Sequence, residues 1–310
     1  MVLLESSVLA QGLPIPANRE AAERMTGAVR AAGAEPAVSA VVRGTPTLGL
    51  EPDELERFLA RDGVRKVSAR DLAPAMLHGA DGATTVAASL ALGTLGGVPV
   101  FATGGIGGVH RVASGSAPSF DESADLVELA RSPMVVVCAG AKSILDLPAT
   151  LERLETLGVP VVGYRTDRLP GFFTVDAGLP VPHQVDSAGD VATLFRHHQA
   201  LGRREAVLVV HPPPAEHALP DAVVARAVAD ALAGAAEAGV TGARVTPYLL
   251  AAVERATAGR SLAANLALLE ANARLAGEIA VALAREPVNG PAGGERSASD
   301  VHWEKSRGAE

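Results

Sequence analysis

The chain has a single cysteine, Cys138, and few aromatic residues, since Phe, Trp and Tyr make up only 3% of its 310 residues. One cysteine excludes an internal disulfide framework and a zinc site built from several cysteines. The shortage of aromatic side chains argues against a stacking platform for nucleic-acid bases.

Basic residues and long apolar runs are also scarce. Lys and Arg number 27 against 35 Asp and Glu, a net charge of −8, so we expect no nucleic-acid partner, which would need a basic face. The longest apolar run, about Met134–Ala141, falls short of the ~18 residues of a membrane span. The segment Met1–Glu5 is too short and too acidic for a signal peptide, so we expect a cytoplasmic protein without membrane contact.

Short apolar runs alternate along the chain with longer helical patterns, which is typical of an α/β fold. Apolar residues make up 48% and charged residues 20%, an ordinary globular composition. The predicted strands are Ala37–Val42, Val98–Ala102, Met134–Cys138, Val159–Tyr164 and Ala206–Val210. The predicted helices are Arg19–Ala32, Pro52–Arg61, Ser68–His78, Thr85–Gly93, Ser123–Arg131, Ser143–Leu157, Pro220–Ala238, Pro247–Thr257 and Leu262–Arg285.

No fixed-period repeat and no internal linker divides the chain, so we expect one α/β domain over residues 1–286. Residues 287–310 are rich in Gly, Ser and charged side chains and are predicted to form a mobile polar tail.

A glycine-rich segment, Phe101–Arg111, directly follows a predicted strand. Glycines let backbone N–H groups approach an anion closely, and Thr103 and His110 add polar side chains. The spacing does not match a dinucleotide fingerprint, because the last glycine of that pattern would fall on His110. The alternative is a tight strand-to-helix turn without a ligand.

Two further segments have both a functional and a structural interpretation. Asp121–Asp125 offers carboxylates and the Ser123 hydroxyl, which suit a hard cation or sugar hydroxyls, but the same residues suit a helix start with Ser or Asp as N-cap. Lys142 follows an apolar strand through a Gly turn, where desolvation favours the neutral, nucleophilic amine. A lysine there can instead extend to solvent or pair with Asp146.

Three weaker features complete the set of candidate residues. Glu5 ends an apolar stretch at the start of the chain, and Lys66 lies in a run of cationic residues that could meet a phosphate. Gly82–Val86 offers the Thr85 hydroxyl and backbone N–H groups at a helix start, which also suits a phosphate.

Taken together and in this order, these segments resemble the pseudouridine-5′-phosphate glycosidase family over nearly the whole chain before the tail. The matching segments are Leu4–Ser7, Lys66–Ser68, Gly82–Val86, Phe101–Arg111, Ser123–Leu126, Cys138–Asp146, Leu154–Pro160, Val185–Ser187, Thr246–Pro247 and Ser261–Asn265.

The resemblance implies an α/β/α sandwich with a central mixed sheet, assembled as a homotrimer. It also implies an enzyme that makes or breaks the carbon–carbon bond between C1 of ribose 5-phosphate and an aglycone carbon. Lys142 would form a Schiff base with C1 of the ring-opened sugar, which supplies the electron sink that a C-glycosidic bond otherwise lacks.

By the same resemblance, Glu5 is the proton donor, and Asn265 is a catalytic pocket residue suited to hydrogen-bond an imide-like edge. The resemblance also implies that Asp121 binds Mn²⁺ or a similar cation, and that water supplies most of the other ligands of this ion. The implied substrate-binding residues are Lys66, Thr85, Val86, Thr103, His110, Ser123, Ala124 and Asp125.

Several positions depart from the family pattern. Gln11 stands where histidine is usual, Gln184 where arginine is usual and His211 where asparagine is usual, and the loop between Arg111 and Phe120 is several residues longer. A longer loop beside a site is a common way to admit another partner. We therefore favour a C-glycosynthase that joins ribose 5-phosphate to an aromatic natural product, as in the alnumycin pathway and thus in antibiotic biosynthesis.

Two alternatives remain open at this point. One is cleavage of pseudouridine 5′-phosphate to uracil and ribose 5-phosphate, with the departures as neutral drift, and the other is a non-catalytic sugar-phosphate sensor. Glu5 also lies closer to the chain start than is usual in the family, so a truncated N-terminus is considered as well.

Overall fold

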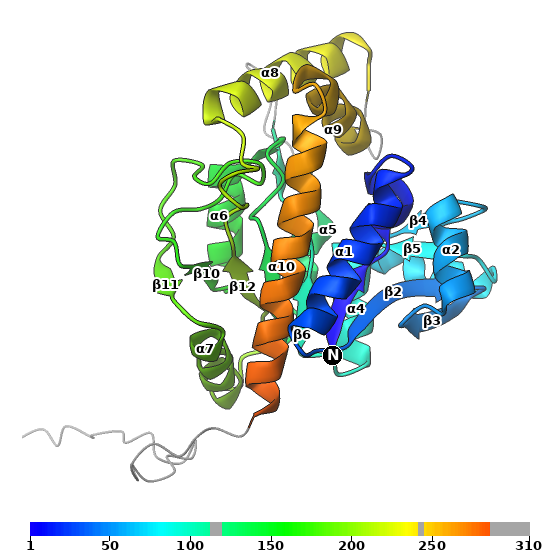
Figure 1. Ribbon diagram of the computed structural model, residues 1–310, viewed down its shortest axis with the longest axis vertical. Coiled ribbons are helices and arrows are strands. Elements are labelled where there is room, and N and C mark those ends of the chain that lie inside the picture. The colour runs from blue at the N-terminus through cyan, green and yellow to red at the C-terminus, as the bar shows by residue number, and fades with distance from the viewer. Residues whose placement is uncertain (112–119, 241–244, 286–310) are drawn as a thin grey trace, which may run out of the picture.

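The computed structural model describes residues 1–111, 120–240 and 245–285, and Figure 1 shows its arrangement. The predicted mobile tail and the long loop after Arg111 lie outside the described residues. A ten-stranded mixed sheet forms the centre, with the strand order β11-β10-β12-β8-β6-β1-β2-β5-β4 and β3 paired to β2. The predicted single α/β domain with a mixed central sheet is therefore confirmed.

The strands are short. Those of the large sheet are β1 (Val2–Glu5), β2 (Pro36–Val42), β3 (Thr45–Leu48), β4 (Arg65–Val67), β5 (Gly82–Thr84), β6 (Val100–Ala102), β8 (Val135–Cys138), β10 (Val161–Tyr164), β11 (His183–Val185) and β12 (Val207–Val210). A separate two-stranded sheet pairs β7 (Val109–His110) with β9 (Leu145–Asp146).

Ten α-helices connect and cover these strands in the described part of the chain. They are α1 (Ala17–Ala31), α2 (Pro52–Ala60), α3 (Leu72–Leu77), α4 (Val86–Leu95), α5 (Ala124–Leu129), α6 (Leu147–Thr156), α7 (Ala188–Ala200), α8 (Asp221–Glu237), α9 (Val245–Ala256) and α10 (Arg260–Ala284). Two short turns, the π-helical η1 (Val8–Gly12) and the 3₁₀ helix η2 (Ala69–Asp71), follow β1 and β4. None of the described helices is long and apolar enough to cross a membrane.

The central strands β1, β6, β8 and β12 are parallel and buried along their whole length. Their continuous apolar sequences are what a parallel strand covered on both faces requires. The antiparallel strands β3 and β5 join the sheet on β2. Ligands of such sheets gather outside the carboxyl ends of the parallel strands, which is where β1, β6 and β8 end together.

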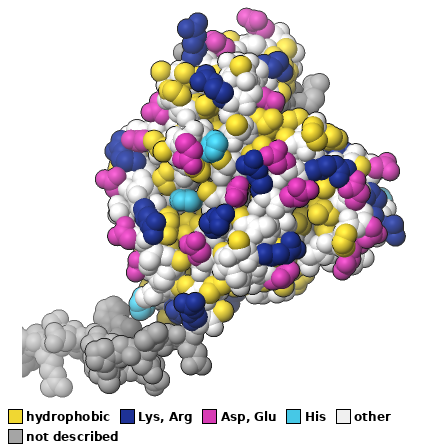
Figure 2. All heavy atoms as spheres, viewed as in Figure 1, with side chains coloured by type: hydrophobic (Ala, Val, Ile, Leu, Met, Phe, Trp, Pro, Cys, Tyr) yellow, Lys and Arg dark blue, Asp and Glu magenta, His cyan; other side chains and the backbone are white. Residues whose placement is uncertain are grey.

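Helix α10 packs along α1 across one face of the sheet (Figure 1). The approach is close at Gly277, where an added Cβ would lie 2.6 Å from the Cβ of Ala32, so a larger residue would push the helices apart. Figure 2 shows basic and acidic side chains intermixed over this face, and Arg24 of α1 pairs with both Glu20 and Glu270.

Some element boundaries differ from the sequence-based expectation. The helix expected from Ser143 begins only at Leu147, because β9 intervenes and Asp146 caps the helix by accepting a hydrogen bond from the Ala149 N–H (3.0 Å). The sequence pattern also missed β1 and α7. The latter begins with a capping box between Ser187 and Asp190, a signal that was present in the sequence.

Candidate active site

A cavity of about 380 Å³ opens where β1, β6 and β8 end, and residues of α9 and α10 form part of its wall. It unites predicted residues from distant parts of the sequence, namely Glu5, Lys66, Lys142 and Asn265. The remaining lining residues are Ser7, Val8, Gln11, Gly12, Leu13, Pro14, Arg61, Gly104, Gly105, Phe172, Phe173, Leu250, Ala251, Glu254, Ser261 and Leu262.

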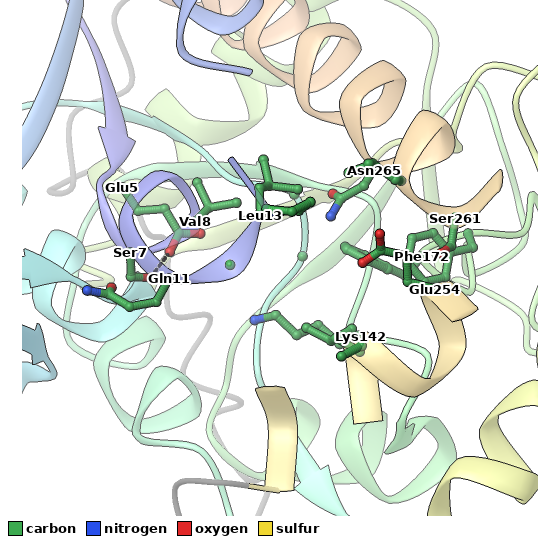
Figure 3. Close-up of a pocket in the computed structure, with 18 of the residues that line it drawn as sticks. Glu5, Ser7, Val8, Gln11, Leu13, Lys142, Phe172, Glu254, Ser261 and Asn265 are labelled. Carbon is green, nitrogen blue, oxygen red and sulfur yellow. Dashed lines mark hydrogen bonds between the residues drawn. The ribbon is translucent and has the colours of Figure 1, made fainter. Parts of the chain in front are cut away.

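Lys142 is held by a continuation of the β6–β8 pairing beyond the strands. The Ala139 N–H donates to Gly104 O (2.9 Å), the Ile106 N–H to Gly140 O (3.1 Å) and the Lys142 N–H to Ile106 O (3.1 Å). The lysine is thus fixed at its backbone by the glycine segment. Its side chain extends into the cavity toward the side that carries Glu5, Ser7 and Gln11 (Figure 3). No ion pair joins Lys142 to Asp146, whose carboxylate caps α6.

Glu5 ends β1 and is only 6% exposed, although the cavity reaches it. Thr103 donates its hydroxyl to Oε1 (2.5 Å) and Ser7 donates to Oε2 (2.6 Å), so both carboxylate oxygens are held. A hydroxyl can rotate to donate or accept, and this pair can therefore serve a carboxyl group that gains and loses a proton. Thr103 contacts Glu5 rather than lining the cavity.

Lys66 lies on β4 at the cavity edge, beside the other charged groups of the site. Burial by the surrounding protein lowers its pKa, the nearby Lys142 charge lowers it further, and Glu5 and Asp125 act in the opposite direction. The side chain nevertheless keeps solvent access in the single chain. Two cations this close favour binding of an anion between them.

The positions after Thr103 require glycine because other side chains pack directly against the backbone there. An added Cβ at Gly105 would lie 2.6 Å from the Phe172 ring, and one at Gly107 would lie 2.2 Å from the Ser123 hydroxyl. The alternative of a strand-to-helix turn is not what the structure shows, because the segment itself ends in β7 (Val109–His110). The contact of its backbone with an anion stays a prediction.

A second group of predicted residues lies next to the cavity but does not line it. The Asp125 carboxylate accepts from the Gly107 N–H (2.8 Å) and the Ala87 N–H (2.9 Å), and so ties the glycine segment to the start of α4. Ser123 caps α5, Thr85 caps α4, and Val86 is buried at the first turn of α4. Ala124 is exposed at the start of α5.

Asp121 is exposed, and its backbone oxygen accepts from the His110 N–H (3.0 Å). Its carboxylate Oδ2 lies 3.8 Å from His110 Nδ1. Within the described residues, no group of three or more His, Cys, Asp or Glu side chains is arranged to hold a metal ion. The residues present therefore fit Mn²⁺ only as an ion held by Asp121 and mostly by water.

Sequence reasoning did not predict much of the cavity wall. Phe172 and Phe173 form an edge-to-face pair (4.6 Å between centroids), and the Phe172 N–H donates to Ala139 O (3.0 Å), which brings this loop against the Lys142 segment. Glu254 of α9 adds an unexpected carboxylate opposite Glu5 (Figure 3). None of these residues carries a local motif, and only their tertiary contacts bring them to the site.

His211 belongs to a buried chain of hydrogen bonds behind Glu5. Its Nδ1 lies 3.2 Å from Asn272 Oδ1, and Asn272 donates to Thr103 O (2.9 Å). Burial lowers the pKa of His211. The hydrogen bond with Asn272 raises this pKa, and the Arg165 charge lowers it. The neutral imidazole is thus the form that the fold accommodates.

We expect this histidine to make stability depend on pH. Since its pKa is lower in the folded chain than the ordinary value of 6.5, the unfolded chain binds more protons as the pH falls below 6.5. The contribution of neutral His211 to the free energy of unfolding is therefore complete above pH 6.5, and it is lost as the pH falls below that value. Melting curves between pH 7 and pH 5 should show a smaller loss for His211→Asn than for the wild type, and equal losses would contradict this assignment.

Comparison with known proteins identifies relatives that match most of the chain. A family model described as Indigoidine synthase A like protein matches residues 1–282. A curated pseudouridine-5′-phosphate glycosidase of Gemmatimonas aurantiaca is 67% identical over 283 residues, 91% of each chain, and one of Herpetosiphon aurantiacus is 50% identical, covering 91% of this chain and 92% of its own.

Two solved structures share the fold. One is the prealnumycin C-glycosynthase AlnA in complex with ribulose 5-phosphate, with TM-score 0.83, 40% identity and 91% of each chain covered. The other is an indigoidine synthase A-like protein of Thermotoga maritima, with TM-score 0.84, 37% identity, and 92% of this chain and 93% of its own covered. The chain therefore belongs to the indigoidine synthase A-like family and is an enzyme of the C-glycosidase type that its relatives' names describe.

Proposed function

We propose that this enzyme makes or breaks the carbon–carbon bond between C1 of ribose 5-phosphate and an aglycone carbon, through a Schiff base on Lys142. The observation that carries the proposal is the shared cavity of Lys142, Glu5 and Asn265, which lie after β8, at the end of β1 and on α10. The names of the relatives and the pentose phosphate bound to AlnA support the same chemistry.

In the cleavage direction, the Lys142 amine attacks C1 and the ring oxygen leaves with a proton, which opens the sugar. The aglycone carbon then takes up a proton, and the bond to C1 breaks as the nitrogen lone pair forms an iminium ion. Water adds to C1 and releases ribose 5-phosphate and the free amine. Synthesis reverses these steps, so Lys142 serves as the nucleophile in both directions.

Glu5 lies where it can deliver and recover these protons, with Thr103 and Ser7 holding its oxygens. Asn265 projects from α10, and its Oδ1 is buried without a hydrogen-bond partner in the described part of the chain, which suits a donor on the aglycone. Lys66, together with the start of α4 at Thr85 and Val86, would hold the phosphate, since a helix N-terminus and a lysine both attract anions. We assign His110, Ser123 and Ala124 to the same end, on the resemblance of the chain to its family, with Asp125 as a positioning residue.

For the aglycone, we propose uracil, released from pseudouridine 5′-phosphate. The support is the 67% identity to a curated pseudouridine-5′-phosphate glycosidase and the polar acceptor of Asn265. The second candidate is C-ribosylation of an aromatic natural product, which we favoured from the sequence. It is supported by the likeness to AlnA and by the apolar wall of Phe172, Phe173 and Leu250.

The test is turnover with defined partners. The purified enzyme should release uracil from pseudouridine 5′-phosphate, and uracil should compete with any aromatic carbon nucleophile for the enzyme loaded with ribose 5-phosphate. Rapid coupling of a hydroxynaphthoquinone, with no reaction of uracil in either direction, would favour the aromatic candidate and contradict the first.

We also propose that Asp121 binds Mn²⁺ weakly, through one carboxylate and water, where the ion would supply positive charge near the start of α5. Removal of divalent ions with EDTA should lower turnover several-fold, and Asp121→Asn should show the same low turnover with or without Mn²⁺. Electron paramagnetic resonance of added Mn²⁺ provides a separate readout. Equal binding by the wild type and Asp121→Asn would show that the ion lies elsewhere.

Assembly into a homotrimer is part of the proposal too, on the resemblance of the chain to its family. Light scattering coupled to gel filtration tests it, and a monomeric mass in active enzyme would contradict it.

A further inference from the structure

Gln11 presents a second unpartnered acceptor to the cavity. It lies in η1, the turn between β1 and α1, and its Oε1 is buried without a hydrogen-bond partner among the described residues. Its Nε2 donates a long hydrogen bond (3.4 Å) to Val64 O, which orients the amide with the nitrogen toward the protein. Figure 3 shows Gln11 beside Ser7 and Glu5, on the side toward which Lys142 extends.

A buried carbonyl oxygen without a partner is costly, and native proteins leave few of them. A ligand that fills the cavity and brings a hydrogen-bond donor to this oxygen removes that cost. A phosphate group offers acceptors at neutral pH and supplies no such donor. Two groups of the proposed substrate do, a ring N–H of the aglycone and a hydroxyl of the sugar.

The surroundings of Gln11 favour the aglycone. Its neighbours in the cavity wall are Val8, Leu13 and Pro14, an apolar surface that suits the flat face of a ring. This apolar surface favours the ring N–H of the aglycone over a sugar hydroxyl as the donor to Gln11.

We infer that Gln11 determines aglycone specificity by accepting, at Oε1, a hydrogen bond from a ring N–H of the aglycone. The inference rests on the proposed function and deepens it. It makes the enzyme selective for nitrogen heterocycles that carry an N–H, and against aromatic carbon nucleophiles that lack one.

The experiment compares pseudouridine 5′-phosphate with its two analogues methylated at one or the other ring nitrogen. Wild-type enzyme should lose about 10-fold or more in kcat/KM with one of the two analogues, because its buried acceptor is then left unpaired. Gln11→Met, which keeps the side-chain length but removes the acceptor, should lower kcat/KM for the unmethylated substrate and reduce the discrimination to about 3-fold or less. Gln11→Glu, which keeps an acceptor, should retain the preference.

Gln184→Met is the matched control, because Gln184 is exposed on β11 and bonds to Asp186 outside the cavity. It should keep the wild-type discrimination. Borohydride trapping of ribose 5-phosphate should be unchanged in Gln11→Met, since the sugar half does not need this acceptor.

Undiminished discrimination in Gln11→Met overturns the inference. The inference is also wrong if Gln11→Met traps less ribose 5-phosphate but still discriminates against the methylated analogue. That result would show that a sugar hydroxyl is the partner of Gln11. If the wild-type enzyme traps the sugar but turns over both methylated analogues as well as pseudouridine 5′-phosphate, this inference is wrong and the proposed function is unaffected. Absence of both trapping and turnover in the wild type overturns the proposed function and this inference with it.

Discussion

Replacement of Lys142 by alanine is expected to lower kcat for uracil release from pseudouridine 5′-phosphate by at least about 10⁴-fold, the scale seen when a catalytic nucleophile is removed. Without its amine, C1 has no electron sink, and the carbon–carbon bond has no leaving group that simple protonation can activate. Lys66 is the neighbouring lysine, but it lies at the cavity edge on β4 and does not follow the β6–β8 pairing that holds Lys142.

Lys142→Arg is the matched variant, because it keeps the positive charge while a guanidinium group does not form a Schiff base. It should be as inactive as Lys142→Ala, with a similar melting temperature for both. A retained tenth of the activity in either variant would contradict the assigned role. A Lys142→Ala protein that kept its full biological output would instead favour the sugar-phosphate sensor.

Replacement of Glu5 by glutamine is expected to lower kcat by about 10²–10⁴-fold, the usual contribution of a positioned proton donor. Glutamine has nearly the same shape but cannot pass a proton between the sugar oxygen and the aglycone carbon. KM should change only a few-fold, because the lysines and backbone groups of the site remain.

The control for Glu5 lies in its two hydrogen-bond partners. Thr103→Val and Ser7→Ala each leave the carboxyl group in place and free one of its oxygens. Their kcat should fall less than that of Glu5→Gln, and a larger fall in either would make the hydroxyl the proton-transferring group.

Two of the proposed catalytic residues, Lys142 and Glu5, could be picked out from the sequence because each lies in a short motif next to a strand end. Lys142 follows a strongly apolar strand and a Gly turn, and Glu5 ends an apolar stretch, although β1 itself was not predicted as a strand. Parallel strands end at one edge of a sheet, so both residues meet there.

The rest of the cavity was not predictable in this way. Phe172 reaches Gly105 through a loop between β10 and β11, and Glu254 arrives from a helix more than 110 residues beyond Lys142 in the sequence. Gln11 was noted only as an unusual residue, since a single glutamine carries no local signal of an unpaired buried oxygen. Asp125, which was expected to contact the substrate, has both carboxylate oxygens hydrogen-bonded to backbone N–H groups, a positioning role that its motif did not indicate. Its contact with the substrate stays a prediction.

The measurement that tests the account most directly is borohydride reduction of the enzyme in the presence of ribose 5-phosphate, followed by mass analysis of the intact chain and its peptides. We predict one stable sugar-phosphate adduct on the peptide that contains Lys142, absent in Lys142→Ala and present in Glu5→Gln. Folded wild-type enzyme that gains no adduct, or that carries it on Lys66 instead, would contradict the Schiff-base mechanism at Lys142.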